Sequence, residues 1–202
     1  MLADLGINAI DAATELWQDA YYDPRKDDDG INARRSKLII TQFIQVGLGW
    51  TWEPRYQGDG SFEWCGAFAA YCWLNLKRDL RKTYFASTYR LDRYARYQSV
   101  NGEKNRGSGR LLAELNEHST TLPWTPRAGD ILTIGPVGSG FGKHICLVES
   151  YANGVFHTIE GNGTGLAPNG KHWQGVVRGE RRLGGDGWHA RRMIRPSSED
   201  IG

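Results

Sequence analysis

The stretch that decides how we expect the chain to fold is FEWCGAFAAYCW, residues 62–73. From Cys65 onward apolar residues recur at intervals of three and four, which is the spacing of a helix with one buried face. Cations follow further along the chain, where they suit the C-terminal end of a helix. We therefore predict a buried helix from Cys65 to Leu80. Its apolar stripe consists of Phe68, Ala69, Cys72, Trp73 and Leu76.

Cys65 opens this predicted helix. The first turn of a helix offers unpaired N–H groups and the positive end of the helix dipole, and both favour a thiolate. The alternative interpretation is a small buried hydrophobic residue next to a tryptophan. Cys72 is the rival nucleophile, but it lies two turns further along, where the dipole gives no help. Cys72 and Cys146 both sit in apolar runs and are interpreted as packed core thiols.

Three short segments are predicted to be strands because they are rich in β-branched residues and are bounded by glycine or turn residues. They are residues 130–134, 144–150 and 155–159. His144 stands at the beginning of the second strand rather than in its middle. A histidine in that place can present its ring to a neighbouring cleft.

The turn at residues 151–154 would pair the second and third strands antiparallel and bring Glu160 and Asn162 to the His144 end. Either residue could bind one imidazole nitrogen and leave the other to accept the thiol proton. Taken singly, Glu160 could be a solvent-facing loop acid and Asn162 an ordinary turn residue. In chain order the sequence therefore offers a thiol, an imidazole and a carboxylate or amide, which are the groups of a cysteine hydrolase. The remaining histidines, His118, His157, His172 and His189, lie in no matching pattern.

Several separated blocks resemble the CHAP amidohydrolases and peptidases, which cut peptidoglycan and belong to the papain-like superfamily. The resemblance covers roughly residues 31–196. It implies an α+β, papain-like fold in which N-terminal helices pack on an antiparallel β-sheet. The corresponding domain organisation is an N-terminal helical extension at 1–30, a catalytic domain at 31–196 and a tail at 197–202. The matching blocks are residues 64–68, 128–131, 144–148, 160–162, 175–178 and 188–194.

The resemblance also assigns roles. Cys65 would be the nucleophile and His144 the base, while Glu160 or Asn162 orients the ring. The backbone N–H of Cys65 would hold the oxyanion together with a polar side chain upstream. The candidates for that second donor are Tyr56 and Gln57, and the aromatic candidates for substrate contact are Trp52, Trp64 and Trp173. We expect no cofactor and no metal.

Composition limits the alternatives. A chain of 202 residues with 40% hydrophobic content can bury a sizeable core and is most simply one domain with an N-terminal extension. The net charge of +2 gives no argument for a dedicated nucleic-acid partner. The basic stretch at residues 90–104 is either a solvated cationic face or the wall of a groove for an anionic polymer.

The first twenty residues have acidic groups, no basic head and no long apolar core, so we expect an amphipathic helix and neither a signal peptide nor a membrane span. A further helix is predicted at residues 32–46. Peptidoglycan lies outside the cytoplasm, so a wall hydrolase made without an export signal must be delivered there. We therefore expect a phage lysin or an antibacterial effector, which implies delivery machinery or an immunity protein as partner.

The bond to be cut stays open between that of an N-acetylmuramoyl-L-alanine amidase and that of a stem or cross-bridge endopeptidase. Two other classes of function stay open as well. One is a cysteine peptidase or acyltransferase that acts on a protein or lipid, and the other is a non-catalytic binding module.

Overall fold

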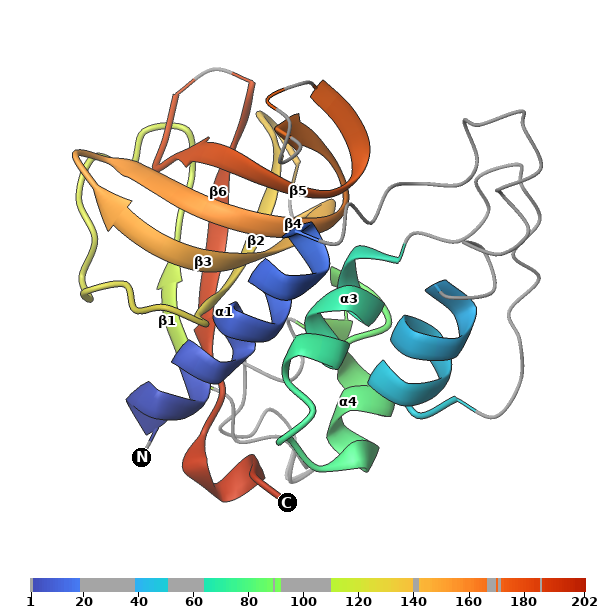
Figure 1. Cartoon of the computed structure of the whole chain (residues 1–202). Coiled ribbons are helices and arrows are strands. Elements are labelled where there is room, and N and C mark those ends of the chain that lie inside the picture. Colours follow the sequence, from blue (N-terminus) through green and yellow to red (C-terminus); the bar gives the residue numbers. More distant parts are fainter. Residues whose placement is uncertain are drawn as a thin grey trace.

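The computed structural model describes residues 2–18, 39–50, 64–88, 90–91, 110–139, 142–166, 170, 172–185 and 187–202. Six strands form one sheet in the order β1-β6-β2-β3-β4-β5. Strand β5 also pairs with β6, in parallel, through Arg182 and His189. Strands β2 to β6 therefore close into a five-stranded barrel, with β1 added outside β6 (Figure 1). The strands are β1 Arg110–Glu114, β2 Ile131–Pro136, β3 His144–Ala152, β4 Val155–Leu166, β5 His172–Arg182 and β6 Trp188–Arg195.

The predicted papain-like fold is wrong, because it required helices packed on an open antiparallel sheet, whereas this sheet closes on itself. Register shifts interrupt the pairing of β2 with β6, of β3 with β4 and of β4 with β5. Each β-bulge bends its strand and increases the local twist, so that the two ends of the sheet meet. The connection that follows β5 contains Gly185 and Gly187, both at positive φ.

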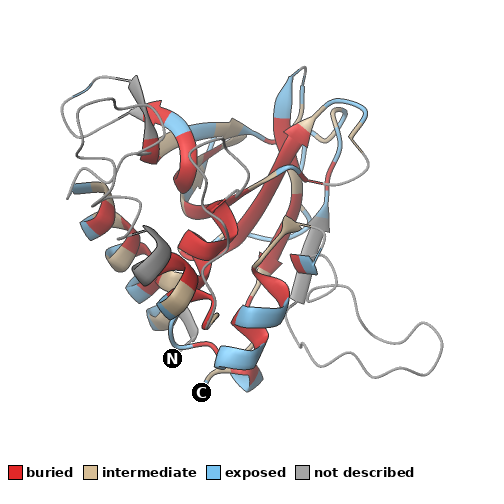
Figure 2. Ribbon diagram, turned by 90° about the vertical axis from the view of Figure 1, so that its right-hand side faces the viewer, coloured by how far each residue is buried: buried red, intermediate tan, exposed pale blue. Residues whose placement is uncertain are grey.

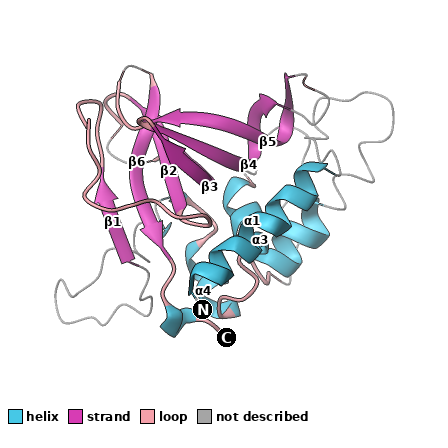
Figure 3. Cartoon of the chain, turned by 60° about the vertical axis from the view of Figure 1, so that its left-hand side comes forward, coloured by secondary structure: helices cyan, strands magenta, loops and turns pink. Residues whose placement is uncertain are grey.

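Helices gather on one side of the barrel (Figure 3). They are α1 Leu2–Gln18, η2 Ile39–Gly47, α3 Cys65–Cys72, α4 Arg78–Tyr84 and the short η3 Ser198–Asp200. The predicted N-terminal helix is confirmed as α1. The predicted helix at 32–46 is described only from Ile39, where its hydrogen bonding is of the π type, and its first part lies outside the described residues. No helix in the described part of the chain is both long enough and apolar enough to cross a lipid bilayer.

The predicted helix from Cys65 to Leu80 is wrong in its length, because the chain leaves the helix after Cys72. Contacts with distant segments hold the chain there. The indole Nε1 of Trp73 donates to the carbonyl of Gly129 at 3.1 Å, and the backbone N–H of Lys77 donates to Asp200 at 2.8 Å. Leu76 forms a β-bridge with Ile201. The tertiary structure therefore overrides the helical periodicity of this segment.

Two apolar cores lie on the two faces of the same strands. Cys146 and Val148 of β3 point to a core inside the barrel, and Ile145 and Leu147 point to a core shared with the helices. Buried residues accordingly run along the strands and through α3 (Figure 2). Helix α1 belongs to the helix-side core, so the residues assigned to an extension pack together with the rest of the domain.

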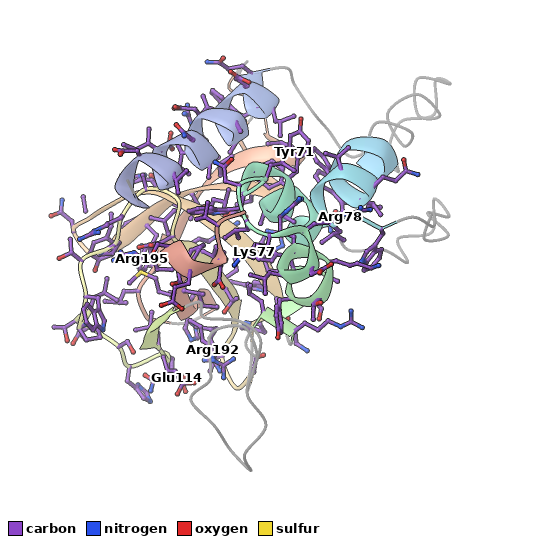
Figure 4. All side chains as sticks on the ribbon, turned by 90° about the horizontal axis from the view of Figure 1, so that it is seen from below. Tyr71, Lys77, Arg78, Glu114, Arg192 and Arg195 are labelled. Carbon is purple, nitrogen blue, oxygen red and sulfur yellow. The ribbon has the colours of Figure 1, made fainter. Side chains whose placement is uncertain are left out.

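A buried ion pair fixes the beginning of β2 to the end of β6. Asp130 is 2% exposed, and Arg195 donates to its two carboxylate oxygens from Nε and Nη2, each at 2.7 Å. Next to it, Gly129 has a φ of 84° and lies against Gly6 of α1, where a side chain would overlap the helix backbone. A second arginine of β6, Arg192, instead pairs with Glu114, whose side chain is 53% exposed (Figure 4).

We predict that Asp130→Asn lowers the free energy of unfolding by about 2 to 3 kcal/mol, because it leaves the Arg195 guanidinium without its counter-charge in a buried place. Urea unfolding monitored by circular dichroism measures the change. The matched control is Glu114→Gln, which removes an exposed partner and should cost less than about 1 kcal/mol. Equal losses in the two variants would contradict the importance given to the buried pair.

Candidate active site

Helix α3 reaches the barrel at two glycines. A methyl group added to Gly66 of α3 would overlap the carbonyl oxygen of Phe85 and press on Ile145 of β3. A methyl group added to Gly161 of β4 would overlap Phe68 of α3. The absence of side chains at these positions therefore allows the beginning of α3 to lie against the beginning of β3, at His144, and the middle of β4, at Glu160.

Cys65 and His144 interact in this place. Cys65 is the first residue of α3 and is 5% exposed, and His144 is the first residue of β3 with a side chain that is 12% exposed. The pKa of His144 is raised to about 10: burial lowers it, but the charge of Cys65 and hydrogen bonds to Cys65 and Glu160 outweigh burial. The imidazolium form is thus favoured beside the sulfur.

Glu160 is completely buried, and its two carboxylate oxygens receive four hydrogen bonds. Oε2 accepts from His144 Nε2 at 3.1 Å and from Arg181 Nη2 at 2.6 Å. Oε1 accepts from Arg181 Nε at 2.8 Å and from the Thr158 hydroxyl at 2.5 Å. Burial alone would raise the pKa of Glu160, but these partners lower it to about 2, so the group is a carboxylate at neutral pH.

The structure thus brings together three of the four predicted catalytic residues through direct interactions, and Glu160 is the one whose carboxylate meets His144. Because Nε2 of the ring is used by Glu160, Nδ1 is the nitrogen left for the thiol of Cys65. Asn162, the fourth, lines the same pocket as His144 and Glu160, with a left-handed backbone at a φ of 58°.

A second cysteine near the site is Cys146 of β3. Its sulfur and the ligand atoms of His144 and Glu160 all lie within 4.8 Å of one another. The set resembles a metal site in composition, but Arg181 places a positive charge on both oxygens of Glu160, which opposes a cation there. Burial raises the pKa of the Cys146 thiol well above its usual range, so Cys146 stays protonated.

An open pocket of about 370 Å³ leads to His144 at one end of the barrel. Trp188 of β6 stands at this pocket with its side chain half exposed, and Arg181 of β5 lies in its wall. The other lining residues are Ile134, Glu160, Asn162, Gly163 and Thr164. A substrate that reaches the imidazole through this pocket would meet an aromatic face, a hydroxyl and an amide.

The remaining predicted residues have different outcomes. Trp64, predicted to contact substrate, is fully buried and stacks on Phe43 with ring centroids 5.4 Å apart. Tyr56, Gln57 and Trp52 lie outside the described residues, and so does the side chain of Trp173. The rival nucleophile Cys72 is buried, and burial raises its thiol pKa far above the ordinary value.

The beginning of α3 presents backbone N–H groups that have no helical acceptor. The backbone N–H of Phe68 closes the first helical turn on the carbonyl of Trp64 at 2.9 Å, so Cys65 belongs to the turn whose N–H groups have no helical acceptor. Within the described residues no side chain caps this end of α3. The N–H of Cys65 can therefore serve an oxyanion formed beside its own sulfur.

Sequence reasoning missed Thr158, Arg181 and Trp188. Thr158 carried a signal, because it precedes Glu160 by two positions and so lies on the same side of β4. Arg181 pairs with Phe156 in the β4–β5 ladder, whereas Glu160 pairs with Val177, so it is the long side chain of Arg181 that reaches the carboxylate. Trp188 joins the pocket because the barrel closes.

Comparison with known protein families, with curated proteins and with solved structures finds no match. The resemblance to CHAP enzymes therefore rests on the quoted sequence blocks alone.

The opposite pKa shifts of Glu160 and His144 give a pH dependence of stability. Because the carboxyl pKa is lower in the folded protein than its ordinary value of 4.5, its stabilising effect is complete above about pH 5 and is lost as the pH falls toward 2. The His144 pKa is raised, so its contribution is complete below pH 6.5 and is lost as the pH rises through about 10.

We expect Glu160→Gln to be clearly less stable than the wild type at pH 6 and to approach it as the pH falls, with the difference shrinking by about 2 kcal/mol between pH 6 and pH 3. Urea unfolding across this range measures it. A difference that stays constant would mean that the carboxylate charge is not what stabilises the folded state.

Proposed function

We propose that the protein is a cysteine amidohydrolase that cleaves an amide bond of peptidoglycan. The observation that carries the proposal is the continuous set of interactions from Cys65 through His144 to the buried Glu160 carboxylate. A thiol next to an imidazole that is itself held by a carboxylate is the arrangement of an activated nucleophile. A core residue would not require this polar chain in a buried place.

The proposed mechanism is acyl transfer through a thioester. His144 takes the proton of Cys65, and the thiolate attacks the amide carbon to form a tetrahedral oxyanion, which accepts a hydrogen bond from the N–H of Cys65. His144 then gives the proton to the leaving amine, and the C–N bond breaks. Water, deprotonated by His144, attacks the thioester and releases the carboxylic acid and the free thiol. Glu160 keeps the ring oriented and stabilises its cationic form.

The choice of peptidoglycan rests on the resemblance of the sequence blocks to the CHAP enzymes. The pocket beside His144 agrees with it in chemistry, since Trp188 and Thr164 offer an aromatic face and a hydroxyl to a peptide or sugar. The proposal includes delivery to the cell wall from the cytoplasm as a lysin or effector, with an immunity protein or delivery machinery as partner and without nucleic acid. The second candidate is a cysteine peptidase or acyltransferase that acts on protein or lipid, because the same residues would catalyse that reaction.

We expect incubation of purified muropeptides with the protein to release new amine and carboxyl termini, which mass spectrometry detects and assigns to one bond. Cys65→Ala and His144→Ala should each lower the rate by at least about 10³-fold, because both residues take part in every turnover. Cys72→Ala is the matched control and should keep the rate within about threefold. If the muropeptides remain intact after incubation with the folded wild type, the wall-hydrolase proposal is contradicted.

Reactivity of the thiol can be tested without a substrate. We predict that iodoacetamide alkylates Cys65 in the folded protein, and that His144→Gln slows this reaction at least about tenfold by removing the base. Cys72 and Cys146 should stay unmodified until the protein is unfolded, because their raised thiol pKa values keep them protonated. Peptide mapping by mass spectrometry identifies the labelled cysteine. If Cys65 is as inert as the other two, the binding-module interpretation gains support.

A further inference from the structure

We propose that Arg181 is a positioning residue of the site, which acts on catalysis by holding Glu160 as a correctly oriented carboxylate. The inference rests on the proposed cysteine chemistry and adds a fourth member to its chain of contacts. Arg181 comes from β5, whereas the predicted catalytic residues come from α3, β3 and β4. It donates from Nε and Nη2 to different oxygens of Glu160, at 2.8 and 2.6 Å.

The two-oxygen contact fixes the plane of the Glu160 carboxylate. A guanidinium presents its N–H groups in a rigid planar fork, so a carboxylate that it binds through both oxygens cannot rotate freely. Oε2 is then held where it also accepts from His144 Nε2. The ring of His144 in turn keeps its other nitrogen toward Cys65. Arg181 therefore sets the direction of the imidazole through one intermediate residue.

Arg181 also supplies the charge that a buried carboxylate requires. Glu160 has no exposed surface, and a carboxylate in such a place takes up a proton unless cations or donors hold it ionised. The titratable and charged groups that act on the Glu160–Arg181 pair are His144 and Cys146 of β3, with Cys65 of α3 reached through His144. Among these only Arg181 carries a positive charge at every accessible pH. Without Arg181, Glu160 would take up a proton, and His144 would then lose the carboxylate oxygen that accepts its hydrogen bond.

The location of Arg181 is suited to this role and not to contact with the reacting atoms. Its side chain is 22% exposed and forms part of the wall of the His144 pocket, and the same residue lines a second pocket of about 440 Å³ on the far side of Thr164. It is separated from Cys65 by Glu160 and His144. Its guanidinium is engaged by Glu160, so it acts on the thiol only through Glu160 and His144.

The chain offers a matched control in the same strand. Arg178 pairs with Glu149 at 2.6 Å and lies over the ring of Trp17 at 4.2 Å, so it too makes an ion pair and packs against its surroundings. Its partner carboxylate is not part of the proposed site. Arg178→Met should therefore report what the loss of a partly buried arginine does to the fold alone.

The experiment compares the wild type with Arg181→Met, Arg181→Lys and Arg178→Met. The rate of Cys65 alkylation by iodoacetamide is measured from pH 4 to 9, and kcat and KM are measured on the muropeptide. For Arg181→Met we expect the pH at which the alkylation rate rises to increase by more than about one unit. We also expect kcat to fall about 10- to 100-fold while KM changes less than about threefold.

Arg181→Lys keeps the charge but loses the fork, so its profile should lie between those of the wild type and Arg181→Met. If Arg181→Met does not fold, the comparison of Arg181→Lys with the wild type tests the positioning role by itself. An alkylation profile of Arg181→Lys or Arg181→Met that coincides with those of the wild type and Arg178→Met would overturn the positioning role. The alkylation arm needs no substrate, so a shifted profile without any muropeptide cleavage would sustain the role of Arg181 while removing peptidoglycan as substrate.

Discussion

The close contact of α3 with the beginning of β3 and the middle of β4 is the constraint on which the candidate site depends. Cys65 comes from the helical layer, whereas His144 and Glu160 come from the barrel, and the two parts meet because Gly66 and Gly161 leave no side chains between them. The aromatic packing of Trp64, Phe68 and Phe43 fills the space around this contact. The proposed nucleophile, at a helix end, thus reaches the proposed base without a loop to carry it, which favours a fixed geometry over an adaptable one.

The barrel strands supply the buried carboxylate of the candidate site and the residues that bind it. Thr158, Glu160 and Arg181 point toward the barrel side of β4 and β5, in a region that is otherwise apolar, and every acceptor position of the carboxylate is used. A polar group in such surroundings is costly unless it is satisfied, and a satisfied one has a single orientation. The ring of His144 stands where this polar cluster meets the helical layer, and so it can transmit the orientation of the carboxylate to the thiol.

Much of the local structure could be predicted from sequence. The strands that begin near Ile131, at His144 and at Val155 are present, and Asn153 and Gly154 form the tight turn that sets the β3–β4 register and brings Glu160 to His144. Local periodicity could not show that the helix would end at Cys72, because the contacts that hold the chain beyond it come from residues 129 and 200. Barrel closure and the partnership of Arg181 with Glu160 depend equally on contacts between distant segments.

Closure of the barrel rests on a single parallel pair between Arg182 and His189, whereas every other junction of the ring has several paired residues. The pocket beside His144 lies next to this seam, since Arg181 precedes it and Trp188 follows it. Separating β5 from β6 here would therefore break fewer paired residues than separating any other two neighbours of the ring, while the ladders that hold His144 and Glu160 would remain intact. The junction that closes the barrel is thus also its most sparsely paired one.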